Sequence, residues 1–135
     1  MALRYLLDTN TVSYHVRRSS PALQKRLKQT RASSVALSVV TEMEIRYGLE
    51  RNPRLRIAPL VEAFLTGLTI LPLDSAVAKQ YAKVRASLEE AGTPIGPLDL
   101  MIAAHAMALG LTLITSNVGE FRCVQGLKCE DWTRG

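Results

Sequence analysis

Four polar side chains that could bind a metal ion or move protons occur just after apolar runs or turn-forming segments of the sequence. They are Asp8 after LRYLL, Glu44 after VALS, Asp99 after GTPIGP, and Asn117 after LTLIT. Carboxylates act as general acids or bases, as nucleophiles, or as ligands for hard metal ions. Because like charges repel, several carboxylates in one site require a cation between them.

Oxygen ligands of this kind favour Mg²⁺, with Mn²⁺ able to substitute. Such an ion lowers the pKa of a bound water and offsets the charge that builds on a phosphate during displacement. The residue set therefore predicts metal-assisted hydrolysis of a phosphodiester without a protein nucleophile. The expected metal ligands are Asp8, Asp99 and Glu44, with Glu42 left as the alternative to Glu44 by the residues alone, and Asn117 completes the catalytic ring.

Apolar runs of strand length alternate with segments of helical period along the chain. Strands are predicted at 3–7, 35–38, 69–73 and 111–115, with an edge strand at 127–132. Helices are predicted from Ser20-Pro21 onward, from the end of VALS to just before Pro53, over 54–66, over the stripe from Val77 to Leu88, and from Leu98 to Leu109. This alternation indicates an α/β fold with a mostly parallel sheet and helices on both faces. Ligands bind at the carboxyl ends of such strands, so the polar residues are expected to converge there.

Length and composition limit the class of protein. With 135 residues, 47% of them apolar, the chain is expected to form one domain over residues 1–135. The N-terminus contains no apolar stretch long enough for a signal peptide or a membrane span, so a cytoplasmic protein without a membrane partner is expected. The net charge of +5 suits an anionic partner. Cys123 and Cys129 have no neighbouring His or Cys cluster, and we expect no zinc site.

Helical periodicity leaves one choice open. Glu42 and Glu44 are two residues apart and cannot share a helix face. Glu44 shares a face with Val40, whereas Glu42 shares one with Ile45. Asp8 and Asp99 could also act as helix N-caps, alone or in addition to binding metal. If Asn117 is not at the site, Glu120 is the next candidate.

Other titratable residues have simpler interpretations. His105 lies on an apolar helical stripe, which favours a core histidine over a general base. The basic run from Arg17 to Arg31 indicates a solvated helix face that could also steer RNA. Arg46 and Arg122 lie nearer the expected crevice and are candidate substrate-binding residues that contact phosphate.

Five segments, in this order, resemble the PIN-domain ribonucleases of the VapC toxin type. They are LLDTN at 6–10, LSVVTEMEIRYG at 37–48, PIGPLDLMIAAHAMALG at 94–110, TLITSNVGEF at 112–121, and the closing EDW. The resemblance implies a three-layer α/β/α fold with four to five strands in the sheet. It places the family's acids at Asp8, Glu44 and Asp99, with Asn117 at a fourth position where the fullest pattern has an acid.

The same resemblance implies a Mg²⁺-dependent endoribonuclease that acts as the toxin of a toxin-antitoxin pair. The expected partners are an RNA substrate, a cognate antitoxin and a second copy of the chain in a homodimer. Operator DNA is expected to be reached only through the antitoxin.

Two other functions compete with this interpretation. DTNTV at 8–12 resembles the nucleophile loop of haloacid-dehalogenase phosphatases, but that chemistry calls for an acid where this chain has Asn10. A catalytically silent module that binds RNA or protein is the second alternative. Three retained carboxylates argue against it, because negative charge in an RNA groove repels phosphate.

Overall fold

A five-stranded parallel sheet forms the centre of the molecule. The computed structural model describes residues 2–134. The strands are β1 (Tyr5–Leu7), β2 (Val35–Ser38), β3 (Thr69–Leu71), β4 (Thr112–Ile114) and β5 (Cys129–Glu130), in the order β3-β2-β1-β4-β5. Each lies within a run that the sequence predicted as a strand, and the predicted parallel α/β sheet is confirmed.

Seven α-helices connect and flank the strands within the described residues. They are α1 (Thr9–Val16), α2 (Pro21–Lys28), α3 (Val39–Arg51), α4 (Ala58–Gly67), α5 (Ser75–Glu90), α6 (Pro97–Leu109) and α7 (Val118–Phe121), with a short 3₁₀ helix at Ala32–Ser34. Ser20 caps α2 by accepting a hydrogen bond from the Leu23 backbone N–H. Gly110, with φ of +67°, ends α6 in the left-handed conformation that glycine favours.

Three helices differ from the sequence predictions. The helix expected over 54–66 begins only at Ala58, because residues 53–57 form turns that connect it to α3. The short helix α7 was not predicted at all, since four residues are too few for a helical period to show. The helix α1 was anticipated only through Asp8 as a possible N-cap, and the structure confirms that cap.

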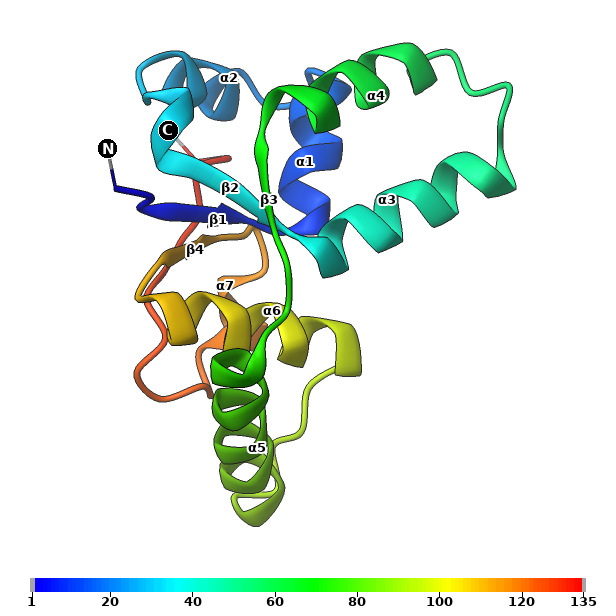
Figure 1. The fold of residues 1–135 in the computed structure, drawn as a ribbon. Helices are drawn as coiled ribbons and strands as arrows, with labels where there is room; N and C mark the ends of the chain where they lie inside the picture. Colours follow the sequence, from blue (N-terminus) through cyan, green and yellow to red (C-terminus); the bar gives the residue numbers. More distant parts are fainter. Residues whose placement is uncertain (1, 135) are drawn as a thin grey trace.

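Alternate residues of β1 face opposite layers of the molecule. Tyr5 and Leu7 pack with residues of α1, α2 and α4, such as Val12 and Leu23. Leu6 packs on the other side of the sheet with residues of α6 and α7. Figure 1 shows these helices on the two sides of the sheet, with α5 packed outside α6. The expected three-layer α/β/α architecture is confirmed.

The strand order reverses between β1 and β4. From β1 the chain proceeds to β2 and β3 on one side, and it later returns to place β4 and β5 on the other. Leu7 and Ile114 are register partners, so the residues that follow them leave the sheet side by side. The Asp8 backbone N–H donates to the Ile114 carbonyl at 3.0 Å. Such a reversal is where open α/β sheets bind ligands.

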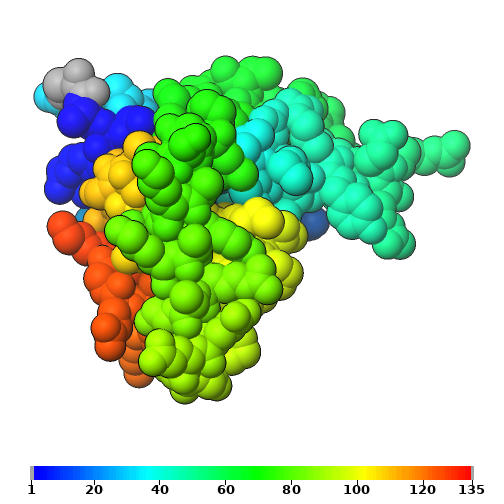
Figure 2. All heavy atoms as spheres, turned by 60° about the horizontal axis from the view of Figure 1, so that its bottom comes forward, coloured from blue at the N-terminus to red at the C-terminus, as the bar shows by residue number. Residues whose placement is uncertain are grey.

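Two parts of the molecule extend away from the sheet. In Figure 2, α5 lies along the front of the molecule, and the connection from α3 to α4 projects to one side. The inner face of α5 is held by Val84 and Leu88, which pack with Leu100 of α6 and with Val124. None of the helices in residues 2–134 is long and apolar enough to cross a membrane.

Candidate active site

Asp8 is the first residue after β1 and is almost fully buried, with 5% of its surface exposed. One carboxylate oxygen accepts a hydrogen bond from the Thr11 backbone N–H at 2.8 Å, which caps α1. The Thr115 hydroxyl also hydrogen-bonds to this carboxyl group, from the end of the neighbouring strand. Burial raises the pKa of Asp8 above its ordinary value, although these hydrogen bonds oppose the rise. Asp8 is therefore both a helix cap and a buried acid at the strand-order reversal.

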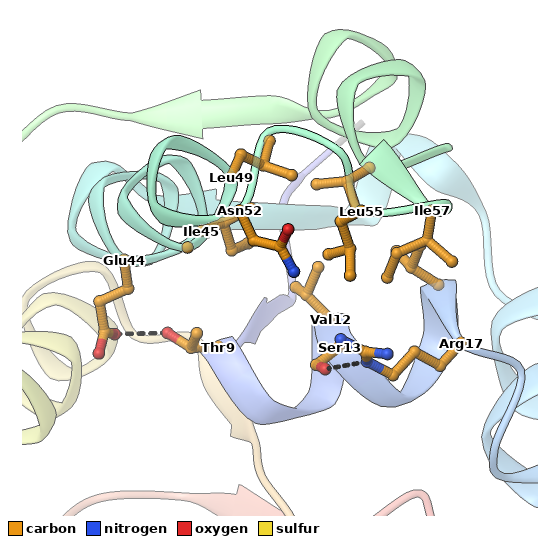
Figure 3. A pocket seen from close by; sticks show the side chains of 13 residues that line it. Thr9, Val12, Ser13, Arg17, Glu44, Ile45, Leu49, Asn52, Leu55 and Ile57 are labelled. Carbon is orange, nitrogen blue, oxygen red and sulfur yellow. Dashed lines mark hydrogen bonds between the residues drawn. The ribbon is translucent and has the colours of Figure 1, made fainter. Parts of the chain in front are cut away.

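The structure separates Glu44 from Glu42. Glu44 accepts a hydrogen bond from the hydroxyl of Thr9 in the first turn of α1, as Figure 3 shows. Glu42 instead accepts a hydrogen bond from Arg46 at 2.8 Å, one turn along the same helix. Glu44 thus faces α1 next to Asp8, and it is the one of the two whose charge acts on Asp99.

Asp99 lies in the first turn of α6 and contacts Glu120 of α7. The two carboxyl groups are hydrogen-bonded to each other. Burial, followed by Glu120, Glu44 and Asp8 as neighbouring acids, raises the pKa of Asp99 to about 7. Four carboxyl groups therefore lie close enough together to hold a proton on Asp99 near neutral pH.

Asn117 is linked to the acid cluster through Glu120. Its side-chain amide donates to a Glu120 carboxylate oxygen at 2.5 Å, and its backbone N–H donates to the Thr115 hydroxyl at 2.9 Å. Asn117 itself is exposed. The fourth carboxylate beside Asp99 is thus Glu120, and Asn117 orients it. Sequence reasoning ranked these two in the opposite order because α7, which brings Glu120 inward, has no visible period.

The two arginines expected to contact substrate are not brought into this cluster. Arg46 is exposed and donates to both Glu42 and Glu62, at 2.8 and 3.0 Å. These partners raise its pKa, with Glu42 the larger influence. Arg122 lines a separate hollow with Lys128 and Cys129, beside β5.

His105 is fully buried, as expected for a core histidine. Its Nδ1 lies 2.8 Å from the Ser38 hydroxyl, which also accepts a hydrogen bond from the Val40 backbone N–H. Ser38 is the last residue of β2 and the cap of α3. The contact therefore ties α6, which carries Asp99, to the start of the helix that carries Glu44.

The donor set fits a hard divalent cation in charge and chemistry. Asp8, Glu44, Asp99 and Glu120 supply carboxylate oxygens, and after burial it is the neighbouring acids that raise the pKa of Asp99. Within residues 2–134, however, no three Asp, Glu, His or Cys side chains are arranged to hold one ion by themselves. The three expected ligands Asp8, Asp99 and Glu44 therefore do not form a complete cage in this structure. Mg²⁺ does not require one, because one or two carboxylates commonly share it with water and substrate phosphate.

A groove of about 310 Å³ adjoins the acid cluster between α1, α3 and α4. Figure 3 shows Glu44 and Thr9 at one end and Arg17 at the other, with Val12 and Leu49 among the apolar side chains between them. The site is therefore open to a chain-like ligand that runs along α1.

Comparison with known proteins supports this interpretation. The PIN-domain family model matches residues 5–126. The chain is 36% identical to the tRNA(fMet)-specific endonuclease VapC of Salmonella typhimurium, over 96% of this chain and 98% of that protein. It is 38% identical to ribonuclease VapC2 of Haemophilus influenzae, with the same coverage. The chain belongs to the PIN-domain family, among its VapC ribonucleases.

Solved VapC structures share the whole fold. The crystal structure of DNA-bound VapBC from Salmonella typhimurium superposes with a TM-score of 0.89, covering 96% of this chain and 98% of that one at 36% identity. VapBC2 from Rickettsia felis, bound to a DNA fragment from its promoter, gives a TM-score of 0.87 at 29% identity, covering 98% and 99%. VapC-type PIN proteins are nucleases that depend on a divalent metal.

Proposed function

We propose that this chain is a Mg²⁺-dependent endoribonuclease that acts as the toxin of a toxin-antitoxin pair. The observation that carries the proposal is the convergence of three carboxyl groups, those of Glu120, Glu44 and Asp8, on Asp99 at the carboxyl edge of the sheet, in a member of the VapC ribonucleases. The whole chain, residues 1–135, serves as one nuclease domain.

Asp8 and Asp99 would hold the ion, with Glu44 and Glu120 completing its surroundings. When bound, the ion would supply the positive charge that offsets negative charge developing on the scissile phosphate. Thr115 and the Thr11 N–H hold the Asp8 carboxylate in place, and Thr9 does the same for Glu44. The carboxyl groups are thus oriented before substrate arrives, which saves reorganisation during reaction.

Before an ion binds, Asp99 holds a proton near neutral pH, because its pKa is about 7 in the metal-free chain. A bound divalent ion would displace that proton. Asn117 keeps Glu120 directed at Asp99. Arg17, at the far end of the adjoining groove, offers a positive charge to an RNA phosphate beyond the cleavage point.

The partners follow from the relatives. Because the solved relatives include toxin-antitoxin complexes with DNA, we propose that a cognate antitoxin binds this chain and that operator DNA is reached only through it. We also propose a homodimer, for which the exposed apolar side chains of Met43, Tyr47 and Leu60 offer contact area. The proposed location is the cytoplasm, where RNA and antitoxin meet.

The test is cleavage of total RNA by purified protein, with Mg²⁺ or with EDTA. We expect new 5′ ends only with Mg²⁺ or Mn²⁺. Asp8→Asn and Glu44→Gln should each reduce the rate by at least about a hundredfold. Asparagine at position 8 retains an oxygen to cap α1, so a loss of rate would report chemistry rather than folding. Cleavage at the wild-type rate by Asp8→Asn, or undiminished cleavage in EDTA, would contradict the proposal.

The toxin role has a cellular test. Inducing the wild-type chain alone in a bacterial host should arrest growth, whereas inducing Asp8→Asn at the same level should not. Equal growth in the two cultures, with both proteins soluble, would show that the chain is not a toxin.

A further inference from the structure

The positive charge of the molecule is concentrated in one segment. Residues 9–41 contain six of the seventeen Lys and Arg residues and none of the twelve Asp and Glu residues. The rest of the chain contains eleven basic residues and twelve acids, so the net charge of +5 comes entirely from this segment. The six basic residues are all exposed: Arg17, Arg18, Lys25, Arg26, Lys28 and Arg31.

The six basic residues all lie in the first part of this segment, which forms α1, α2 and the turns after each helix, and we call residues 9–31 the basic ridge. In Figure 1 it covers one face of the sheet, and α2 lies away from the N-terminal ends of α3 and α6. Hollows flank α2 on both sides. One, of about 430 Å³, is lined by Lys25, Arg26 and Arg134, and the other, of about 300 Å³, by Arg18 and Lys28.

Acids pair with two of the cations around α2, Arg26 and the nearby Arg134, whose partner Asp131 lines the same hollow. Arg26 lies 3.7 Å from a Glu130 carboxylate oxygen and 4.5 Å from the centre of the Trp132 ring. In the part of the chain that the structure describes, Lys25 and Lys28 form no ion pair. Arg18 is in the left-handed region, with φ of 54°, which an arginine rarely adopts. Glycine or asparagine would be less strained at this position.

The chemistry of the ridge fits a phosphate backbone better than a protein. Protein interfaces have an apolar centre, but Tyr14 of α1 is the one large apolar side chain exposed on the ridge within the described residues, and α2 exposes none. Apart from Pro21, the exposed residues of α2 are the cations Lys25, Arg26 and Lys28, which can contact phosphates as in nucleic-acid complexes.

The ridge also leads to the acid cluster. Asp8 caps the start of α1, and Arg17 follows its end. Eight residues of helix rise about 12 Å, which a nucleic-acid strand covers in roughly three to four nucleotides.

We propose that the basic ridge is a second RNA-binding surface, which holds the substrate's phosphate backbone at least four nucleotides from the cleaved bond. This inference rests on the proposed ribonuclease function and adds to it a requirement for substrate length. RNA reaches α2 only when it extends past the end of α1, and contacts there add affinity without depending on base sequence.

A binding experiment in EDTA tests the ridge separately from catalysis. Fluorescence anisotropy measures the affinity of labelled single-stranded RNAs of about twenty and about four nucleotides over a range of salt concentrations. For the longer RNA, the double variant Lys25→Gln/Lys28→Gln should lose about tenfold in affinity at low salt, and the slope of log affinity against log salt should fall by about two. The short RNA should bind wild type and double variant alike.

The matched control removes the same charge elsewhere. The control variant Lys79→Gln/Lys83→Gln changes two residues on the exposed face of α5 and has the same net charge as the ridge double variant. Its affinity for the longer RNA should fall by less than about twofold. Arg18→Asn is a second ridge variant, because asparagine tolerates the left-handed conformation. It should weaken binding of the longer RNA without lowering the thermal midpoint, whereas a purely structural role for Arg18 would change only the midpoint.

If the ridge double variant and the α5 double variant lost the same affinity for the longer RNA, the proposal would be overturned, because net charge alone would then explain binding. It would also be overturned if the ridge variants bound RNA normally but lost affinity for a polyglutamate peptide, because the surface would then be a protein-docking site. RNA cleavage by the wild-type protein is measured separately. If the wild type cleaves RNA and the ridge variants bind RNA normally, only the proposed role of the ridge is rejected. If RNA binding depends on the ridge but the wild type does not cleave RNA, only the proposed nuclease function is rejected.

Discussion

At the scale of single residues, the hydrogen-bonded pair of Asp99 and Glu120 is the most informative feature of the site. Two carboxyl groups in direct contact must share a proton or a cation, because both cannot ionise freely. Glu44 and Asp8 increase the same effect on Asp99. Under the proposed function a divalent ion would displace this proton, so metal binding is expected to depend on pH.

The first prediction concerns stability against pH in the absence of metal. The pKa of Asp99 is about 7 in the folded chain and about 3.9 in an unfolded one, so the folded state binds more protons between these values. Stability therefore falls as pH rises from about 4 to about 7. Thermal unfolding in EDTA should give a lower midpoint at pH 8 than at pH 5.5. Asp99→Asn should raise the midpoint at pH 8 and weaken the pH dependence, and an unchanged profile would show that Asp99 is not the titrating group.

The second prediction separates Glu120 from Asn117. Asn117→Ala removes only the bond that orients Glu120, so we expect about a tenfold fall in kcat, as for other groups that orient a metal ligand. Glu120→Gln removes a charge beside Asp99 and should cost about a hundredfold or more. Because Asn117 is exposed, the thermal midpoint of the Asn117→Ala protein should stay near that of wild type. A larger loss for Asn117→Ala than for Glu120→Gln would reverse the roles assigned to them.

The limits of sequence reasoning at this scale are physical. Asp8 and Asp99 were recognisable because each follows a strand or a linker signal. The sequence could not decide between Glu44 and Glu42, because both lie on α3 and helical periodicity groups each of them with apolar neighbours. What distinguishes them is the hydrogen bond from Thr9 and the ion pairs of Arg46, and these depend on how α1 and α4 pack against α3.

At the scale of elements, three helix starts set the geometry of the site. Asp8 caps α1, Ser38 caps α3 two turns before Glu44, and Asp99 lies in the first turn of α6. Partial positive charge at helix N-termini stabilises carboxylates there. The contact between His105 and Ser38 connects α6 to the start of α3 within the core. It therefore maintains the spacing between Asp99 and Glu44.

The third prediction tests that connection. His105→Gln should lower the free energy of unfolding by about 1–3 kcal/mol, because it disrupts a buried hydrogen bond without restoring the partner. Metal dependence and the pH profile of RNA cleavage should be retained by the folded fraction. Urea unfolding monitored through Trp132, with activity measured on the same samples, distinguishes the outcomes. A fully stable but inactive variant would place His105 in the chemistry rather than in the core.

The sequence predicted most elements because their signals are local. Ser20-Pro21 and Gly110 mark helix ends by capping chemistry, and the stripe from Val77 to Leu88 marks the buried side of α5. Prediction from the sequence failed at α7 and at the start of α4. α7 is short, and residues 54–57 contain no Gly or Asn signal to show that they form turns rather than helix.

At the scale of the whole molecule, sheet topology brings together acids that are far apart in the sequence. Reversal of strand order between β1 and β4 places Asp8 beside the turn that leads to Glu120, while α3 and α6 bring their acids to the same edge. Four of the twelve acids lie at this edge, whereas α1, α2 and the turns after them (residues 9–31) carry six basic residues and no acid. An RNA strand therefore meets attraction along the ridge and needs a cation at the acids.

The most direct test of the account is calorimetry of Mn²⁺ binding to wild type, Asp99→Asn and Glu42→Gln at pH 6 and pH 8. Glu42→Gln is the matched control, because it removes one carboxylate from the same region but outside the cluster. We predict that wild type binds Mn²⁺ and releases a proton at pH 6, that Asp99→Asn binds at least about tenfold more weakly, and that Glu42→Gln binds like wild type. Binding by Asp99→Asn as tight as that of wild type, or an equal loss in Glu42→Gln, would contradict a metal site at these carboxylates.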